Sequence, residues 1–225
     1  MPSPTLPELH AAVIEWAGID RGNGSILSRA NPVGQAAKTL EEIGEASQVE
    51  AAWMRAQDTT GRYIPLELWE WIDDNLPPKD VKRLTEVAMG EDKQSDLLVN
   101  ALETMLATEL GDVLVTLCIQ AHMQGWTLAS CIPPDPCSIS TWDVPCSWEN
   151  VKFLGSSFRA TISAKMVGEA TSGDVVAAIL DIYRCVTNAA VTINRTPEQC
   201  LAAAYEKIKN RSGHINEQGQ LVKAS

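Results

Sequence analysis

Two pairs of carboxylates recur at helical spacing in this chain. Glu42 and Glu45 are three residues apart, and so are Glu109 and Asp112. Side chains at this spacing share one face of a helix, where like charges repel each other by roughly a few tenths of a kcal/mol. The second pair lies in a strongly apolar stretch, so we expect it to point toward the interior, where an unpaired carboxylate costs roughly several kcal/mol. A positive charge must therefore lie close by.

A divalent cation is the simplest source of that charge. Four carboxylates from two antiparallel helices would make an oxygen-only site, which suits Mg²⁺ or Mn²⁺ better than zinc. Alternatively, Glu41, Glu42 and Glu45 lie on a solvated face, with Lys38 paired to Glu41 or Glu42. Di-iron bundles carry Glu-x-x-His on two helices. None of the three histidines follows a glutamate by three residues, which argues against that chemistry.

The hydrophobic periodicity predicts the helices that position these residues. Strand-like runs bounded by turns are scarce, so we predict an all-α fold, a helical bundle. A stretch rich in Pro, Ser and Cys over 132–148 is typical of a linker. We expect helices over 34–57, 66–74, 79–89, 95–124, 149–171, 174–193 and 197–211.

The six cysteines fall into two sets. Cys118, Cys185 and Cys200 lie in apolar helical runs, where a buried reduced thiol is expected. Cys131, Cys137 and Cys146 lie in or near the linker and could bind zinc. The chain has no CxxC pair and no evident fourth ligand, so a structural zinc site is not favoured.

The two halves of the chain resemble each other. The segment 112–131 aligns without gaps on 181–200, and IGEAS over 43–47 matches VGEAT over 167–171. We therefore predict a duplicated two-helix unit, with a first repeat over 1–131, the linker and a second repeat over 149–225, forming one compact domain overall. The spacing of the matches places an insertion in the first repeat, at about 58–95.

Composition limits the classes of partner. The chain has 225 residues, 45% hydrophobic and 21% charged, which indicates a globular protein. A net charge of −11 disfavours binding to a nucleic-acid backbone. We see no signal peptide and no apolar stretch long enough to cross a bilayer. The expectation is a soluble cytoplasmic protein with no nucleic-acid or membrane partner.

Three blocks of sequence, in order, resemble a known family. KTLEEIGEAS, then ELGDVLVTLCIQAH, then the tail AYEKIKNRSGHINEQGQLVK are similar to the EExxE…ExxD signature and the basic C-terminal segment of the MazG-like all-α NTP pyrophosphatases, relatives of the dimeric dUTPases. The resemblance covers about half of the chain. It implies Mg²⁺-dependent hydrolysis of a nucleoside triphosphate to the monophosphate and diphosphate.

The resemblance also implies roles for individual residues. Glu42, Glu45, Glu109 and Asp112 would bind the metal, and Glu41 would lie behind them or help to orient water. Lys207 and Arg211 would face the phosphates, with Lys38 as a weaker candidate. Because cations are favoured at any helix C-terminus, Lys207 and Arg211 also have a purely structural explanation.

The base pocket is harder to place. We expect the inserted segment WEWIDDNLPP to act as a lid or specificity element, with Trp69 stacking on the base. Trp53, Trp71, Trp126 and Tyr63 could stack too, although aromatic residues in helical proteins are more often part of the core. The base and sugar that the site prefers depend on the shape of this pocket.

The chain departs from the family in one respect. The usual members are single four-helix units that dimerise and build their sites between protomers. Here the second repeat has Lys165, Met166 and Ala178 where the first has acids, while the first repeat has no basic tail. We therefore expect a fused pseudo-dimer with one working site, present as a monomer or a homodimer.

Two other kinds of protein fit the same residues. One is a non-catalytic helical protein whose acids bind a metal or a basic partner. The other is a purely structural bundle with solvated acids, in which a metal would not affect stability.

The division of labour between the repeats is testable. Glu169 and Asp181 are the two acids left at matching positions of the second repeat. If the working site uses the acids of the first repeat, the double variant Glu169→Ala/Asp181→Ala should keep its turnover of nucleotide. Abolished turnover in a variant that is still folded by circular dichroism would contradict the single-site arrangement.

Overall fold

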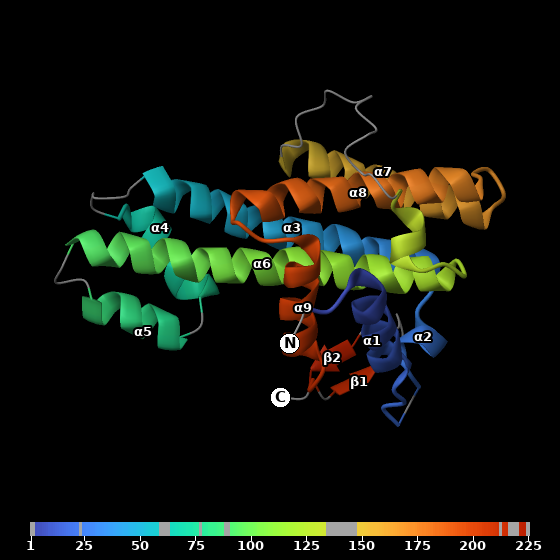
Figure 1. Ribbon diagram of the computed structural model, residues 1–225, viewed down its shortest axis with the longest axis horizontal. Coiled ribbons are helices and arrows are strands. Elements are labelled where there is room, and N and C mark those ends of the chain that lie inside the picture. Colours follow the sequence, from blue (N-terminus) through green and yellow to red (C-terminus); the bar gives the residue numbers. More distant parts are fainter. Residues whose placement is uncertain are drawn as a thin grey trace. The chain divides into compact units, whose positions relative to one another are not determined.

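The computed structural model describes residues 3–22, 24–58, 64–76, 78–87, 91–133, 148–211, 213–215 and 221–223 (Figure 1). The chain forms two compact units. The first comprises 1–44 and 107–225, and the second comprises 45–106. The three carboxylates discussed below and both lysines that pair with them belong to the first unit.

The all-α prediction is confirmed, apart from one small hairpin. The elements are α1 (Leu6–Gly18), α2 (Ile26–Arg29), α3 (Pro32–Asp58), α4 (Leu66–Asn75), α5 (Pro78–Val87), α6 (Glu91–Met123), the 3₁₀ helix η1 (Leu128–Cys131), α7 (Trp148–Met166), α8 (Ser172–Thr192), α9 (Pro197–Ile208), β1 (Gly213–Ile215) and β2 (Leu221–Lys223). The two strands pair antiparallel, with Gly213 opposite Lys223.

Several sequence expectations need correction. The periodicity did not predict α1, although Thr5 and Glu8 form a capping box at its start. The helix expected over 149–171 ends at Met166, because Gly168 adopts a left-handed φ of 81° that closes a turn before α8. The last helix ends at Ile208 rather than 211.

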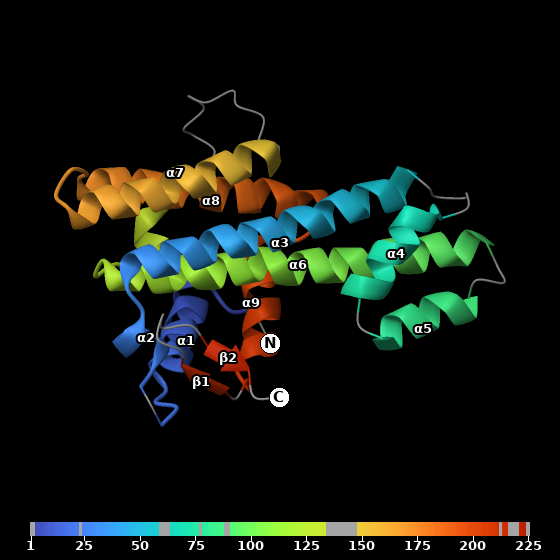
Figure 2. The same cartoon turned by 180° about the vertical axis from the view of Figure 1, so that it is seen from behind.

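The first unit packs helices on both sides of α6. α7 and α8 lie side by side as an antiparallel hairpin in both views (Figures 1 and 2). α9 packs against α1 and α8. From Glu109 to Ala121 every residue of α6 is buried, so this stretch is enclosed by its neighbours.

Glycine allows two very close contacts between helices. A Cβ on Gly111 of α6 would lie 2.1 Å from the carbonyl oxygen of Cys200 in α9. A Cβ on Gly155 of α7 would lie 2.7 Å from Cδ1 of Leu40 in α3. Gly111 stands between Glu109 and Asp112 in sequence, so α9 is held against the part of α6 that carries both acids.

The predicted repeat has a counterpart in the local structure of two helix ends. After α6, Gly125 has a φ of 81° and Thr127 caps η1; after α8, Asn194 has a φ of 53° and Thr196 caps α9. The backbone hydrogen bonds also correspond: Trp126 N–H donates to the Ala121 oxygen (3.0 Å) and Arg195 N–H to the Ala190 oxygen (2.9 Å). These equivalent turns support the alignment, while the duplication itself stays a prediction.

Within the described residues, α8 is the one helix long and apolar enough to cross a membrane. Core helices of soluble proteins meet the same criteria, and 44% of its most apolar window is buried. It packs against α7, α9 and η1 here, as a core helix would.

The contact at Gly111 yields a stability prediction. Gly111→Ala should lower the free energy of unfolding by about 3 kcal/mol, because the new methyl group would overlap the Cys200 backbone and force α9 away. Chemical denaturation measures this change.

Gly44→Ala is the matched control. Gly44 lies inside α3, and a Cβ there meets nothing within 4 Å. The control should raise stability by about 0.5–1 kcal/mol, because alanine is the better helix former. Equal effects of the two substitutions would refute the close contact between α6 and α9.

Candidate metal centre

One buried face of α3 carries polar residues. Gln35, Thr39 and Glu42 recur at helical spacing and are 7%, 0% and 8% exposed. Asn31 precedes the helix and accepts a hydrogen bond from the Gly34 N–H (2.7 Å), which caps the first turn. The Thr39 hydroxyl donates to the Gln35 carbonyl oxygen (3.1 Å) and is satisfied within the helix.

α6 carries a matching set. Glu109, Asp112, Thr116 and Gln120 share one face and are all buried. The Gln35 side-chain amide donates to the Thr116 carbonyl oxygen (3.4 Å), so the two sets meet. We call these seven residues, Gln35, Thr39 and Glu42 with Glu109, Asp112, Thr116 and Gln120, the polar stripe.

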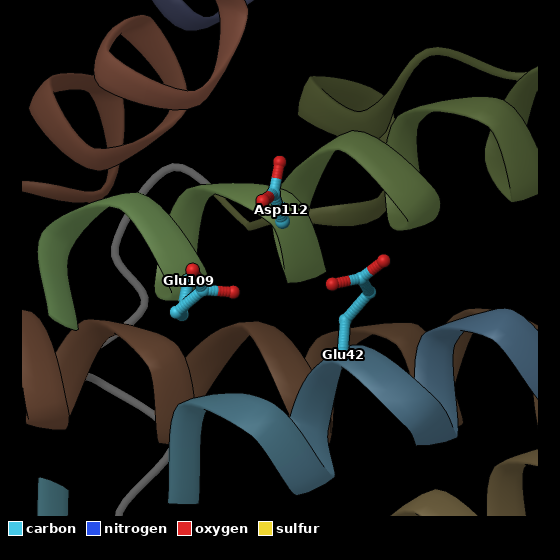
Figure 3. A group of neighbouring side chains, drawn as sticks. All are labelled: Glu42, Glu109 and Asp112. Carbon is cyan, nitrogen blue, oxygen red and sulfur yellow. The ribbon is translucent and has the colours of Figure 1, made fainter. Parts of the chain in front are cut away.

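Three carboxylates of the polar stripe come together. Glu42 extends from α3 toward α6, which carries Glu109 and Asp112 (Figure 3). One oxygen of each lies within 4.8 Å of the others, and each residue is 8% exposed. Three negative charges so close in a poorly hydrated place repel each other strongly, so this cluster needs cations.

Lys207 supplies one cation from the last turn of α9. Its Nζ lies 2.8 Å from Oδ2 of Asp112 and 3.3 Å from Oε1 of Glu109. Burial lowers the pKa of Lys207, but the charges of Asp112 and Glu109 outweigh it, and the pKa lies above the usual value. The ammonium is therefore charged at neutral pH.

Lys38 supplies a second cation from within α3. Its Nζ lies 2.8 Å from Oε1 of Glu42 and 2.8 Å from Oε1 of Glu41. Burial lowers the pKa of Lys38, yet the hydrogen bonds to Glu41 and Glu42 raise it further than burial lowers it. Lys38 thus pairs with both glutamates, one of them buried, rather than with one on a solvated face.

The donor set fits a hard divalent cation. The three residues offer only carboxylate oxygens, and with both lysines in place the group retains a net charge of −1. Mg²⁺ and Mn²⁺ prefer such ligands. These three residues are the group of potential metal ligands found among the residues that the structure describes.

The other predicted site residues are not members of this group of three carboxylates. Glu45 is exposed in α3, one turn after Glu42, and does not belong to the group of three. Glu41 is exposed and paired with Lys38. Arg211 follows α9 and is near enough to Lys207 to lower its pKa. Trp69 is partly exposed on α4, in the second unit.

The sequence also raised the possibilities of a zinc site at the cysteines near the linker and of further aromatic residues that stack on a base. Cys131 is 4% exposed and its thiol donates to the Thr127 carbonyl oxygen (3.5 Å), which fits a buried reduced thiol. Cys137, Cys146 and Tyr63 lie outside the described residues. Trp53 is 7% exposed and belongs to the core.

The segment predicted to be a second repeat does not assemble an equivalent cluster in the part of the chain that is described. Asp181 matches Asp112, but its side chain is 44% exposed and lies 3.5 Å from Arg184. Burial raises the pKa of Asp181, while the Arg184 charge partly offsets that effect. Glu169 is exposed. The acids remaining at these positions are therefore dispersed.

Sequence reasoning missed the uncharged part of the polar stripe. Gln35, Thr39, Thr116 and Gln120 stand one or two turns from the predicted ligands, on the same helix faces. The signal was present, because polar residues at this spacing interrupt the apolar faces of both helices.

Protein-family models, curated proteins and solved structures were compared with this chain, and none of the three comparisons finds a match.

Gln120 provides a test of the polar stripe. It is fully buried, and neither atom of its amide has a hydrogen-bond partner among the described residues. An unsatisfied buried amide is costly, so Gln120→Met should raise the free energy of unfolding by about 1 kcal/mol in chemical denaturation.

Gln35→Met is the matched control, because the Gln35 amide does donate a hydrogen bond. This substitution should lower the free energy of unfolding by about 1 kcal/mol. A loss of similar size in both variants would show that the Gln120 amide is satisfied after all.

Proposed function

We propose that this chain is a Mg²⁺-dependent nucleoside triphosphate pyrophosphohydrolase, which converts an NTP or dNTP and water to the monophosphate and diphosphate. The observation that carries the proposal is the group of three buried carboxylates, Glu42, Glu109 and Asp112, on two facing helices. These are three of the four ligands that the resemblance to the MazG-like family implies. Mn²⁺ would serve in place of Mg²⁺.

The metal would neutralise the triphosphate and lower the pKa of the attacking water. Glu42, Glu109 and Asp112 would hold it, each offering one oxygen. Lys207 and Arg211, at the end of α9, would bind the phosphates and stabilise the charge on the leaving diphosphate. Glu41 has an exposed side chain beside Lys38 and could orient water.

The fused pseudo-dimer belongs to the same proposal. The equivalent turns after α6 and α8 support the duplication. The dispersed acids of the second repeat favour one working site, formed by carboxylates of the first repeat and basic residues of the second. Such a chain would be active as a monomer or as a homodimer.

A non-catalytic helical protein is the second candidate, and one observation favours it. Lys38 and Lys207 already neutralise most of the carboxylate charge from within the chain. A cluster compensated in this way could be a structural ion-pair network, or could bind a metal or a basic partner without any hydrolysis.

Release of diphosphate distinguishes the two candidates. The purified protein is incubated with each of the eight common ribo- and deoxynucleoside triphosphates, with Mg²⁺ and with EDTA. The proposal expects Mg²⁺-dependent release with at least one nucleotide. Asp112→Asn should then lower kcat/KM by about 100- to 1000-fold, because a metal ligand contributes several kcal/mol to transition-state stabilisation.

Two further variants sharpen the assay. Glu15→Gln removes an exposed carboxylate from α1 and should leave turnover unchanged. Glu45→Gln tests whether this exposed carboxylate is the fourth ligand that the resemblance implies. No release with any nucleotide from folded protein would favour the non-catalytic candidate.

A further inference from the structure

The Lys207 ammonium pairs with both carboxylates that α6 contributes to the candidate metal centre. Nζ lies within hydrogen-bonding distance of both Glu109 and Asp112, two of the three carboxylates in the candidate metal centre. It reaches them from α9, an element distant in sequence. The same two residues would therefore serve both as the ion-pair partners of a lysine and as ligands of a metal.

The ammonium and a metal would compete for the charge of the same two carboxylates. Mg²⁺ is held by carboxylate oxygens, so it would draw on the negative charge of Glu109 and Asp112 that now faces the Lys207 ammonium. Both are cations, and the side chains of these two acids are only 11% exposed, so water screens their repulsion poorly. Binding of a divalent ion would therefore weaken the attraction between these carboxylates and the ammonium.

Lys207 can leave without any rearrangement of the fold. Gly111 lies against the backbone of Cys200 and the Cβ of Ala204, two turns and one turn before the lysine, so α9 is fixed there independently of Lys207. The Lys207 side chain is 37% exposed and has a flexible four-carbon stem, so it can swing toward solvent while α9 stays in place.

We propose that Lys207 is an internal counter-ion which the metal displaces, so that metal binding releases this ammonium to the phosphates of the nucleotide. The inference rests on the proposed function for the identity of the metal and the anion. Lys38 stays on Glu42, and exchange of Lys207 for a divalent ion changes the charge of the group from −1 to neutral. When the metal binds, Glu109 and Asp112 thus exchange Lys207 for the metal, and Lys207 exchanges these carboxylates for the phosphates.

A consequence follows for the order of binding. A metal alone must replace an existing ion pair, so its affinity is reduced by the strength of that pair. A metal that arrives with phosphates also supplies a new partner for Lys207, so each of the two ligands should strengthen the binding of the other.

Direct Mn²⁺ binding tests the exchange without any reference to turnover. Free Mn²⁺ is measured by electron paramagnetic resonance during titration of wild type, Lys207→Met and Lys209→Met, with no nucleotide present. Lys207→Met should bind Mn²⁺ about tenfold more tightly than wild type, because no ammonium has to be displaced. Lys209→Met is the matched control: it removes the same charge, but Lys209 pairs with Glu206 rather than with the candidate metal ligands. Its Mn²⁺ affinity should equal that of wild type.

Two further measurements guard against a folding defect. Without metal, Lys207→Met should melt at a lower temperature than wild type, because Glu109 and Asp112 lose their ion pairs with Lys207. Saturating Mn²⁺ should raise the melting temperature of this variant more than that of wild type. Lys207→Arg keeps the charge and should bind Mn²⁺ about as weakly as wild type.

The outcomes separate this inference from the proposed function. If Lys207→Met binds Mn²⁺ no more tightly than Lys209→Met, the exchange is wrong, whether or not the protein hydrolyses nucleotides. If no variant binds Mn²⁺, both the metal centre and the exchange are wrong. Tighter binding by Lys207→Met alone supports the exchange even when no nucleotide is hydrolysed.

Discussion

Three carboxylates buried between α3 and α6 are the constraint on which the rest of the first unit depends. Glu42, Glu109 and Asp112 are each 8% exposed and lie too close together to remain charged without nearby cations. Lys38, in the same helix as Glu42, supplies one of these positive charges. Lys207 supplies the other, and it reaches Asp112 because α9 lies against α6. The two helices can come this close because residue 111 has no side chain.

The enclosed position of α6 explains why its polar residues must be satisfied within the protein. Between Glu109 and Ala121 this helix has no exposed residue, so its acids cannot turn to water. Thr116 bonds within its own helix and its carbonyl accepts from Gln35, while the Gln120 amide has no partner within the described part of the chain. Burying a polar stripe in such a place lowers the stability of the fold. Destabilising buried polar groups of this kind are found most often at functional sites.

The ends of α6 and α8 combine equivalent local structure with different chemistry. The turns after α6 and α8 share their backbone hydrogen bonds, their left-handed residue and their capping threonine. The side chains nearby differ: Asp112 is buried beside Lys207, whereas Asp181 is half-exposed beside Arg184. The geometry of such a turn depends on a few capping residues, so the same turn can stand beside a buried charge cluster or beside a half-exposed ion pair.

The sequence by itself located the helices from α3 to α9 and the two acidic pairs, but not α1, α2, η1 or the hairpin. Periodicity located α3 and α6, and the spacing of Glu109 and Asp112 within an apolar run predicted that they point inward, because burial follows directly from helical period. Tertiary structure decided which acids meet and what neutralises them. Glu42 joins the group while Glu45, one turn away, is exposed, because one helix face is covered and the next is not. The pairing of Lys207 with acids 98 and 95 residues earlier in the chain depends on how α9 packs, and no local pattern encodes that contact.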